Sequence, residues 1–251
     1  MRLRLADFGI FILLFLLAVA LQWPATWLAP WIDRGSNGHW RLGGVEGHPW
    51  NGSGILLVRA GDTAPWRIAQ SVRWQLLWSE LAAGHLAVDL SLEQGGLRLV
   101  ASGSGFAVEQ IRVSLPAAEV TSQLPGALGR YGWSGTLSAS SAGYRCNWSA
   151  QNCNGEIDLL WNDAAVTEIP GPALGDYRLH LVGEGPTLHV DLATLRGRLQ
   201  LNGSGEVSAK SVRFSGEASA TGPDAETLGA LLNTLGRPAG VPNKYLIEYR
   251  E

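Results

Sequence analysis

The sequence predicts a mainly β protein, in which an N-terminal transmembrane helix is followed by an antiparallel β-meander or curved sheet with a short helix near the C-terminus. Three observations lead to this fold class. An uncharged apolar run lies near the start, apolar residues alternate with polar ones over much of the remaining chain, and 32 of the 251 residues are glycine. Alternation indicates half-buried strands, and glycines between such runs indicate tight turns.

The N-terminal segment predicts a membrane anchor. Arg2 and Arg4 lie in residues 1–7, and residues 8–28 contain no charged side chain. At about 1.5 Å per residue such a helix crosses a hydrocarbon core of about 30 Å. Positive charge before the helix places residues 1–7 in the cytoplasm and the bulk of the chain in the periplasm. Trp23, Trp27 and Trp31 are then expected at the far membrane interface as an aromatic belt.

A cleaved signal peptide is the alternative for the same segment. Ala18-Val19-Ala20 fits the small-residue cleavage pattern, and the mature chain would then begin at Leu21. Both interpretations export the bulk of the chain to an oxidising compartment.

The two cysteines, Cys146 and Cys153, agree with export, because disulfides persist in such compartments. Their close spacing predicts a disulfide across a hairpin end, worth about 2–3 kcal/mol in the chain-entropy model. A metal site would need more ligands than two thiolates, and no histidine lies nearby in the sequence.

After a linker at residues 29–42, weak self-similarity predicts two β repeats, at 43–130 and 131–251. Each begins with a tryptophan followed two residues later by glycine, and each carries Leu-Leu-Trp at the same distance downstream. Val-Asp-Leu and Gly-Ser-Gly then follow in the same order. The landmarks are Trp50-Asn51-Gly52, Leu76-Leu77-Trp78, Val88-Asp89-Leu90 and Gly103-Ser104-Gly105, against Trp133-Ser134-Gly135, Leu159-Leu160-Trp161, Val190-Asp191-Leu192 and Gly203-Ser204-Gly205. A stacked duplication explains this order; chance within a vocabulary of Leu, Val, Gly and Ser is the alternative.

The predicted strands have one apolar and one polar face. Leucines and valines recur at every second position over 86–92 and 188–192, which places them on one side of a sheet. Such a face suits the core of a sandwich or a groove that holds lipid, and the sequence leaves both open.

Helices are expected in few places. The clearest is 224–235, where leucines recur at helical spacing between Pro223 and Gly236, and 245–249 reads as a final strand. A short helix is expected within 116–128 and a short turn at 79–83.

The sequence indicates no enzyme. It lacks the metalloprotease, phosphate-loop and nucleophile-elbow motifs. The five histidines are scattered; His189 and Asp191 would share one strand face, where an ordinary surface pair is the interpretation. The recurring Gly-Ser-Gly triplets indicate turns or bulges. We therefore expect no catalytic, cofactor-binding or metal-binding residues. With a net charge of -3 and no basic patch, a nucleic-acid partner is not expected.

The chain resembles the N component of the bacterial type II secretion system. The resemblance covers mainly the C-terminal half and rests on structural motifs in addition to the N-terminal segment. These motifs are Gly155-Glu156-Ile157-Asp158-Leu159-Leu160-Trp161, Gly171-Pro172-Ala173-Leu174-Gly175-Asp176-Tyr177, Thr194-Leu195-Arg196-Gly197-Arg198-Leu199-Gln200-Leu201-Asn202-Gly203-Ser204-Gly205 and Leu231-Leu232-Asn233-Thr234-Leu235-Gly236.

This resemblance implies a single-pass inner-membrane protein with an accessory role in moving folded proteins from the periplasm through the outer membrane. Its implied partners are the inner-membrane platform proteins, the L and M components. The meander is also similar to the envelope proteins related to AsmA, which hold lipids in β grooves. A lipid-binding or lipid-transfer role is therefore the alternative, by analogy of fold alone.

Overall fold

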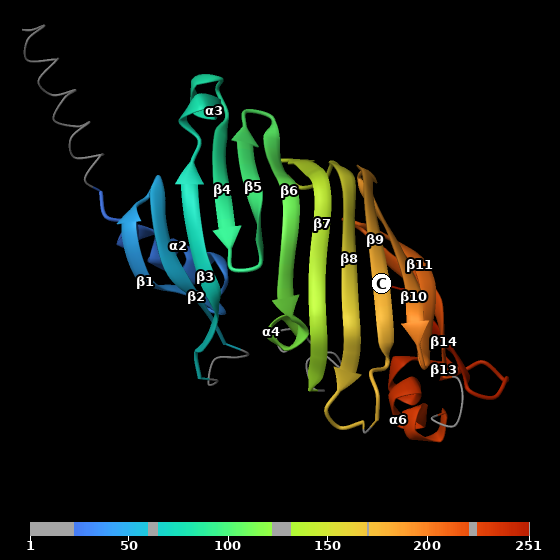
Figure 1. Ribbon diagram of the computed structural model, residues 1–251. Coiled ribbons are helices and arrows are strands. Elements are labelled where there is room, and N and C mark those ends of the chain that lie inside the picture. Colours follow the sequence, from blue (N-terminus) through green and yellow to red (C-terminus); the bar gives the residue numbers. More distant parts are fainter. Residues whose placement is uncertain (1–22, 60–64, 122–131, 170, 221–224, 251) are drawn as a thin grey trace, which may run out of the picture. The chain divides into compact units, whose positions relative to one another are not determined.

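The computed structural model describes residues 23–59, 65–121, 132–169, 171–220 and 225–250. The chain forms two compact units that divide between Leu76 and Leu77. Both units consist mainly of β-strands (Figure 1). Each strand pairing described below is antiparallel. The predicted mainly β, antiparallel fold class is confirmed.

The first unit is a three-stranded meander with two short helical segments. Its elements are η1 (Ala25–Trp27), α2 (Leu28–Gly35), β1 (Trp40–His48), β2 (Asn51–Val58) and β3 (Arg67–Leu76). β2 pairs with β1 on one side and β3 on the other. η1 and α2 pack on β1. One sheet face buries Leu42, Val58 and Trp74, whereas the opposite face exposes Ile55 and Ile68.

The end of the predicted transmembrane helix is not a regular α-helix. Residues 8–22 lie outside the described residues, and within the described part no helix is long and apolar enough to span a membrane. Pro24 is extended (φ -73°, ψ 139°), Ala25–Trp27 is a 3-10 helix, and α2 begins at Leu28. Proline lacks an amide proton and disfavours helical geometry in the residue before it. The range 29–42, expected as a linker, contains most of α2 and the start of β1.

The second unit is one layer of sequential strands (Figure 1). Its strand order is β4-β5-β6-β7-β8-β9-β10-β11-β12-β14-β13. Its elements are α3 (Trp78–Ala82), β4 (Leu86–Leu92), β5 (Gly95–Ser102), β6 (Gly105–Pro116), α4 (Ala117–Thr121), β7 (Trp133–Asn147), β8 (Cys153–Val166), β9 (Gly175–Gly185), β10 (Thr187–Gly197), β11 (Leu199–Ser208), β12 (Val212–Ala220), α6 (Ala225–Leu235), β13 (Arg237–Pro238) and β14 (Lys244–Arg250).

Strand register gives this sheet the expected apolar and polar faces. Leu159 pairs with Leu179, and Leu179 pairs with Leu192, so these leucines form an apolar row across three strands. One residue earlier on β8 a polar row begins, from Asp158 to His180 to Asp191. No second sheet packs on either face among the described residues of this unit, so the sandwich alternative does not describe it.

The core of the second unit lies at one end of the apolar face, beneath α6. Leu228, Leu231 and Leu232 of α6 pack with Leu199 and Ala218 of the sheet. The helix expected at 224–235 and the final strand expected at 245–249 are thus present as α6 and β14. Eleven residues of helix extend about 16 Å, whereas the 15 residues of β7 extend about 50 Å. The helix therefore covers only part of the strand length.

The landmarks of the proposed duplication occupy different places in the strands. Gly103-Ser104-Gly105 makes the turn between β5 and β6, whereas Gly203-Ser204-Gly205 lies inside β11. Leu76-Leu77-Trp78 joins β3 to α3, whereas Leu159-Leu160-Trp161 lies inside β8. The duplication stays a prediction from sequence.

Candidate interaction surfaces

The predicted disulfide between Cys146 and Cys153 is present and joins the ends of β7 and β8. The loop that it closes is further fixed by the Asn147 side chain. Asn147 Oδ1 accepts hydrogen bonds from the Ser149 hydroxyl (3.1 Å) and from the amides of Gln151 (3.0 Å) and Asn152 (3.2 Å). The disulfide and these three hydrogen bonds fix the conformation of the hairpin tip.

Trp148 projects from this hairpin tip and is 59% exposed. Its indole nitrogen donates a hydrogen bond to the Ser102 carbonyl (3.0 Å), and its ring lies 6.1 Å from that of Phe106. The indole is thus held in one orientation while most of its surface faces solvent. A large aromatic side chain that is ordered before binding loses little entropy when a partner covers it.

Four more exposed apolar side chains lie at the same end of the sheet. Ala101 pairs with Phe106 on one side and with Leu86 on the other, which connects Trp148 to the start of β4. The amide of Leu77 donates to the Ala87 carbonyl (2.8 Å), which brings α3 to the same place. We call the group of Trp78, Leu81, Leu86, Leu99 and Trp148 the Trp148 cluster; all five side chains are exposed.

The polar face carries paired charges. Asp158 accepts from Arg178 (2.7 Å) and contacts His180 Nδ1 at 3.0 Å. Burial opposes ionisation of Asp158, but the hydrogen bonds from Arg178 and His180 outweigh it and lower the pKa of this carboxyl. Within the described ranges no group of three His, Cys, Asp or Glu side chains could hold a metal ion.

The predicted pair of His189 and Asp191 does lie on one face of β10, where both border a common hollow. The imidazole of His189, however, contacts Glu184 and Glu206, each at 3.7 Å. Glu184 lies in β9 and Glu206 in β11, so both contacts join β10 to the strands beside it. The sequence indicated a surface pair of His189 with Asp191, whereas the carboxylates that His189 contacts are those of Glu184 and Glu206.

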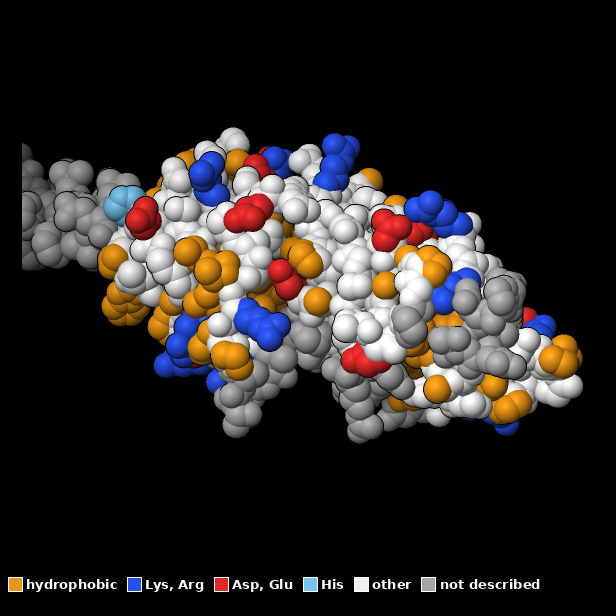
Figure 2. All heavy atoms as spheres, turned by 60° about the horizontal axis from the view of Figure 1, so that its bottom comes forward, with side chains coloured by type: hydrophobic (Ala, Val, Ile, Leu, Met, Phe, Trp, Pro, Cys, Tyr) orange, Lys and Arg blue, Asp and Glu red, His pale blue; other side chains and the backbone are white. Residues whose placement is uncertain are grey.

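Two hollows also lie on the polar side. One of about 500 Å³ is bordered by Arg98, Glu109, Arg145 and Asn154, and one of about 810 Å³ by His189, Asp191, Arg213 and Glu248. Arg98 is already committed to a two-point ion pair with Asp89. Figure 2 shows charges of both signs interspersed with hydrophobic groups on the face turned forward. Neither hollow has the apolar lining that an acyl chain requires.

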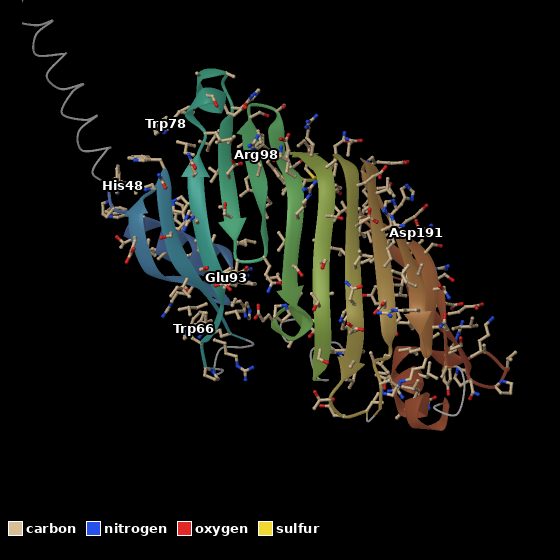
Figure 3. All side chains as sticks on the ribbon, viewed as in Figure 1. His48, Trp66, Trp78, Glu93, Arg98 and Asp191 are labelled. Atoms are coloured by element: carbon tan, nitrogen blue, oxygen red, sulfur yellow. A yellow bond between two sulfur atoms is a disulfide. The ribbon has the colours of Figure 1, made fainter. Side chains whose placement is uncertain are left out.

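Figure 3 places the labelled side chains on the ribbon. Trp78 and Arg98 lie toward one end of the strands of the second unit, and Glu93 lies toward the other. In the first unit, His48 and Trp66 lie toward opposite ends of the meander. The guanidinium groups of Arg41 and Arg59 lie 4.7 and 4.9 Å from the Trp66 ring, a cation–π arrangement.

The three tryptophans predicted at a membrane interface are all exposed. Trp27 is 59% and Trp31 71% exposed, and Trp23 packs edge-on against Trp27 with ring centroids 5.4 Å apart. The structure thus brings them to one surface of the first unit. Their contact with a membrane stays a prediction.

A comparison with protein-family models decides the family. The model for the type II secretion system protein N matches residues 38–241, which is most of the chain. The chain belongs to the type II secretion system protein N family. Searches of curated proteins and of solved structures give no significant match. The match extends over both units and confirms the resemblance seen in the sequence.

Membership of the protein N family makes this protein a component of the type II secretion system and a participant in protein transport. The family is one of secretion components and implies contacts with other parts of that system. The Trp148 cluster was not predicted from the sequence, because the exposure of a side chain depends on which other residues cover it. The one available signal was Trp148 itself, a bulky aromatic residue between two cysteines in a polar loop.

Proposed function

We propose that the protein is an accessory inner-membrane component of the type II secretion system that assists export of folded proteins through contacts with the L and M platform components. The observation that carries this proposal is the Trp148 cluster. Trp148 and Trp78 are 59% and 56% exposed at the same end of one sheet. Tryptophan is enriched among the residues that dominate protein interfaces, and clustered exposed apolar side chains mark such sites.

The electrostatics of the second unit agree with a protein partner. The charged groups near the cluster are largely neutralised in pairs, such as Arg98 with Asp89 and Arg145 with Glu109. No strong field of one sign would attract a polyanion, so apolar contact rather than charge would provide the binding energy.

Site-specific crosslinking tests the proposal. A photoreactive amino acid replaces Trp148 or Trp78 in the full-length chain, expressed in cells that carry the complete secretion system. We expect covalent adducts with the L or M component. The control is the same probe at Asp191, an exposed position on the polar face. Adducts of equal yield at Asp191, or no platform adduct from either tryptophan, contradict the proposal.

A second candidate function, lipid handling in the envelope, is favoured by the apolar sheet face. Away from α6, side chains such as Leu181, Leu188 and Val190 remain only half-buried. Among the described residues, α6 packs on one end of this face, with Leu228, Leu231 and Leu232 against Leu199 and Ala218. Hydrocarbon chains would complete its burial without needing hydrogen-bond partners.

Lipid extraction separates the two functions. Purified full-length protein is washed in detergent, and its bound lipid is measured after substitution of Val190 by Asp. A stoichiometric phospholipid that this substitution removes, with no platform protein ever recovered, favours lipid handling and overturns the secretion-platform proposal. The matched control is Asp191→Ala, one residue along the same strand on the opposite face.

A further inference from the structure

The helical segment η1–α2 is apolar on two opposite sides. Its inner side packs on β1 through Ala25, which is buried, and through Leu28 and Ile32, which are half-buried. Its outer side carries Trp27 and Trp31, which are 59% and 71% exposed.

A helix on the surface of a soluble protein normally turns polar residues outward. Here Pro30 and Arg34 complete the outer side beside the two tryptophans, and both are exposed. Helical spacing of 3.6 residues places Asp33 away from the centre of this side. Asp33 lies instead near Arg41, with 3.8 Å between their charged atoms. The outer side therefore has the composition of an interfacial helix, with tryptophan for the headgroup level and a cation for lipid phosphates.

Contacts at the start of the segment fix where the chain reaches this helix. The Trp23 carbonyl accepts a hydrogen bond from His48 Nδ1 (3.2 Å), and the His48 carbonyl accepts one from the Trp74 indole (3.1 Å). Trp23 is thereby tied to the end of β1. The extended Pro24 then separates η1 and α2 from the residues before them.

The sequence immediately before Trp23 points to a lipid bilayer as the occupant of the outer side. Residues 8–22 contain no charged side chain, and the chain enters the described structure directly after them. An apolar run of this kind inserted in a bilayer would hold Trp23, Trp27 and Trp31 at the membrane surface. The local concentration of lipid there would be far above that of any soluble protein.

We propose that η1–α2 lies in the plane of the membrane interface, with Trp23, Trp27 and Trp31 in the headgroup region of the bilayer. This inference rests on the membrane location in the proposed function and adds an orientation to it. The α2 side of the first unit faces the membrane. The opposite side of the same meander, which exposes Ile55 and Ile68, faces the periplasm and its protein partners.

Spin-label depth measurement tests this orientation on the full-length chain in vesicles of phosphatidylethanolamine and phosphatidylglycerol. A nitroxide is attached at Trp31→Cys and, as a matched control, at Ile68→Cys, which is 69% exposed on the other side of the unit. Cys146 and Cys153 are joined in a disulfide, and the described residues include no free thiol. Both changed side chains face solvent, so the fold should tolerate either substitution.

We expect the ratio of collisions with oxygen to collisions with a water-soluble nickel chelate to be several-fold higher at position 31 than at position 68. Equal ratios at the two positions overturn the inference. Protection of position 31 from both reagents also overturns it, because the site would then be covered by protein, such as a second copy of the chain. Crosslinking at Trp148 is read independently, so failure of the orientation leaves the platform proposal standing.

Discussion

At the scale of single residues, one buried carboxylate holds an irregular part of the sheet in place. Asp176 is buried at the start of β9. It accepts a hydrogen bond from the amide of Asp163 (2.7 Å) and forms an ion pair with Arg196. Asp163 has a positive φ of 50° and lies where the register between β8 and β9 shifts. Asp176 therefore fastens this bulge to two neighbouring strands.

These contacts predict an acid-sensitive contribution to stability. The hydrogen bond from the Asp163 amide, followed by the contact with Arg196, lowers the pKa of Asp176. A carboxyl with a lowered pKa in the folded state stabilises the fold above its unfolded pKa, about 3.9. That contribution is lost as the pH falls through the lower folded value. We expect the free energy of unfolding to decrease as the pH drops below about 4. In the Asp176→Asn variant this decrease with pH should be less steep.

Chemical denaturation at a series of pH values measures this difference. Asp191→Asn is the matched control, because Asp191 is exposed on β10; that variant should keep the acid slope of the parent. An unchanged slope in Asp176→Asn would show that this carboxyl does not provide the acid sensitivity.

At the scale of elements, one glycine determines how β5 joins β6. Gly95 has a φ of +120°, and a Cβ atom there would lie 1.8 Å from the Arg112 carbonyl oxygen. Gly95 pairs with Val113, next to the register shift between Gly96 and Arg98. The backbone of β6 approaches so closely that only glycine fits.

Substitution of Gly95 by alanine should therefore separate these strands. We expect Gly95→Ala to reduce the free energy of unfolding by about 1–3 kcal/mol or more, from backbone strain together with overpacking. Gly103→Ala is the control in the turn at the opposite end of β5, where a Cβ would meet nothing within 4 Å. Thermal unfolding followed by circular dichroism compares the two. Equal midpoints would refute the steric argument.

The disulfide hairpin leads to a second prediction for an element. Cys146→Ser with Cys153→Ser should lower the free energy of unfolding by about 2–3 kcal/mol, because the unfolded chain regains the entropy of an open loop. Reductant provides the matched control: it should bring the parent down to the stability of the variant and leave the variant unchanged. A parent that is equally stable in oxidant and reductant would contradict the prediction.

At the scale of the whole molecule, the sequence predicted what depends on local periodicity. Alternating leucines and valines identified β4 and β10, and helical leucine spacing identified α6 within one residue at its start. The close cysteines identified their own disulfide. These features depend on a few neighbouring residues, so a pattern in the sequence is enough to find them.

Features that depend on long-range packing were not predictable in the same way. The helix α2 was not predicted, and most of it was assigned to the linker. Its eight residues contain Pro30 and show no clear signal for the start or end of a helix. Prediction of the Trp148 cluster would require the strand pairing that makes Leu86, Ala101 and Phe106 neighbours. Strand pairing brings those residues together, and no local pattern encodes which side chains then remain uncovered.

The location of the whole chain gives the last prediction. With Arg2 and Arg4 before an uncharged run, alkaline phosphatase fused after Glu251 should be active, because it folds only in the periplasm. The membrane-bound protein should retain residues 8–28 uncleaved. Arg2→Glu with Arg4→Glu should reduce the correctly oriented fraction, since positive charge retains a terminus in the cytoplasm.

Sequencing of the N-terminus distinguishes a retained anchor from a cleaved signal peptide. A mature chain that starts at Leu21 would overturn the anchor and leave export intact, and the exposed Trp23, Trp27 and Trp31 would then be the membrane contacts left in the described structure.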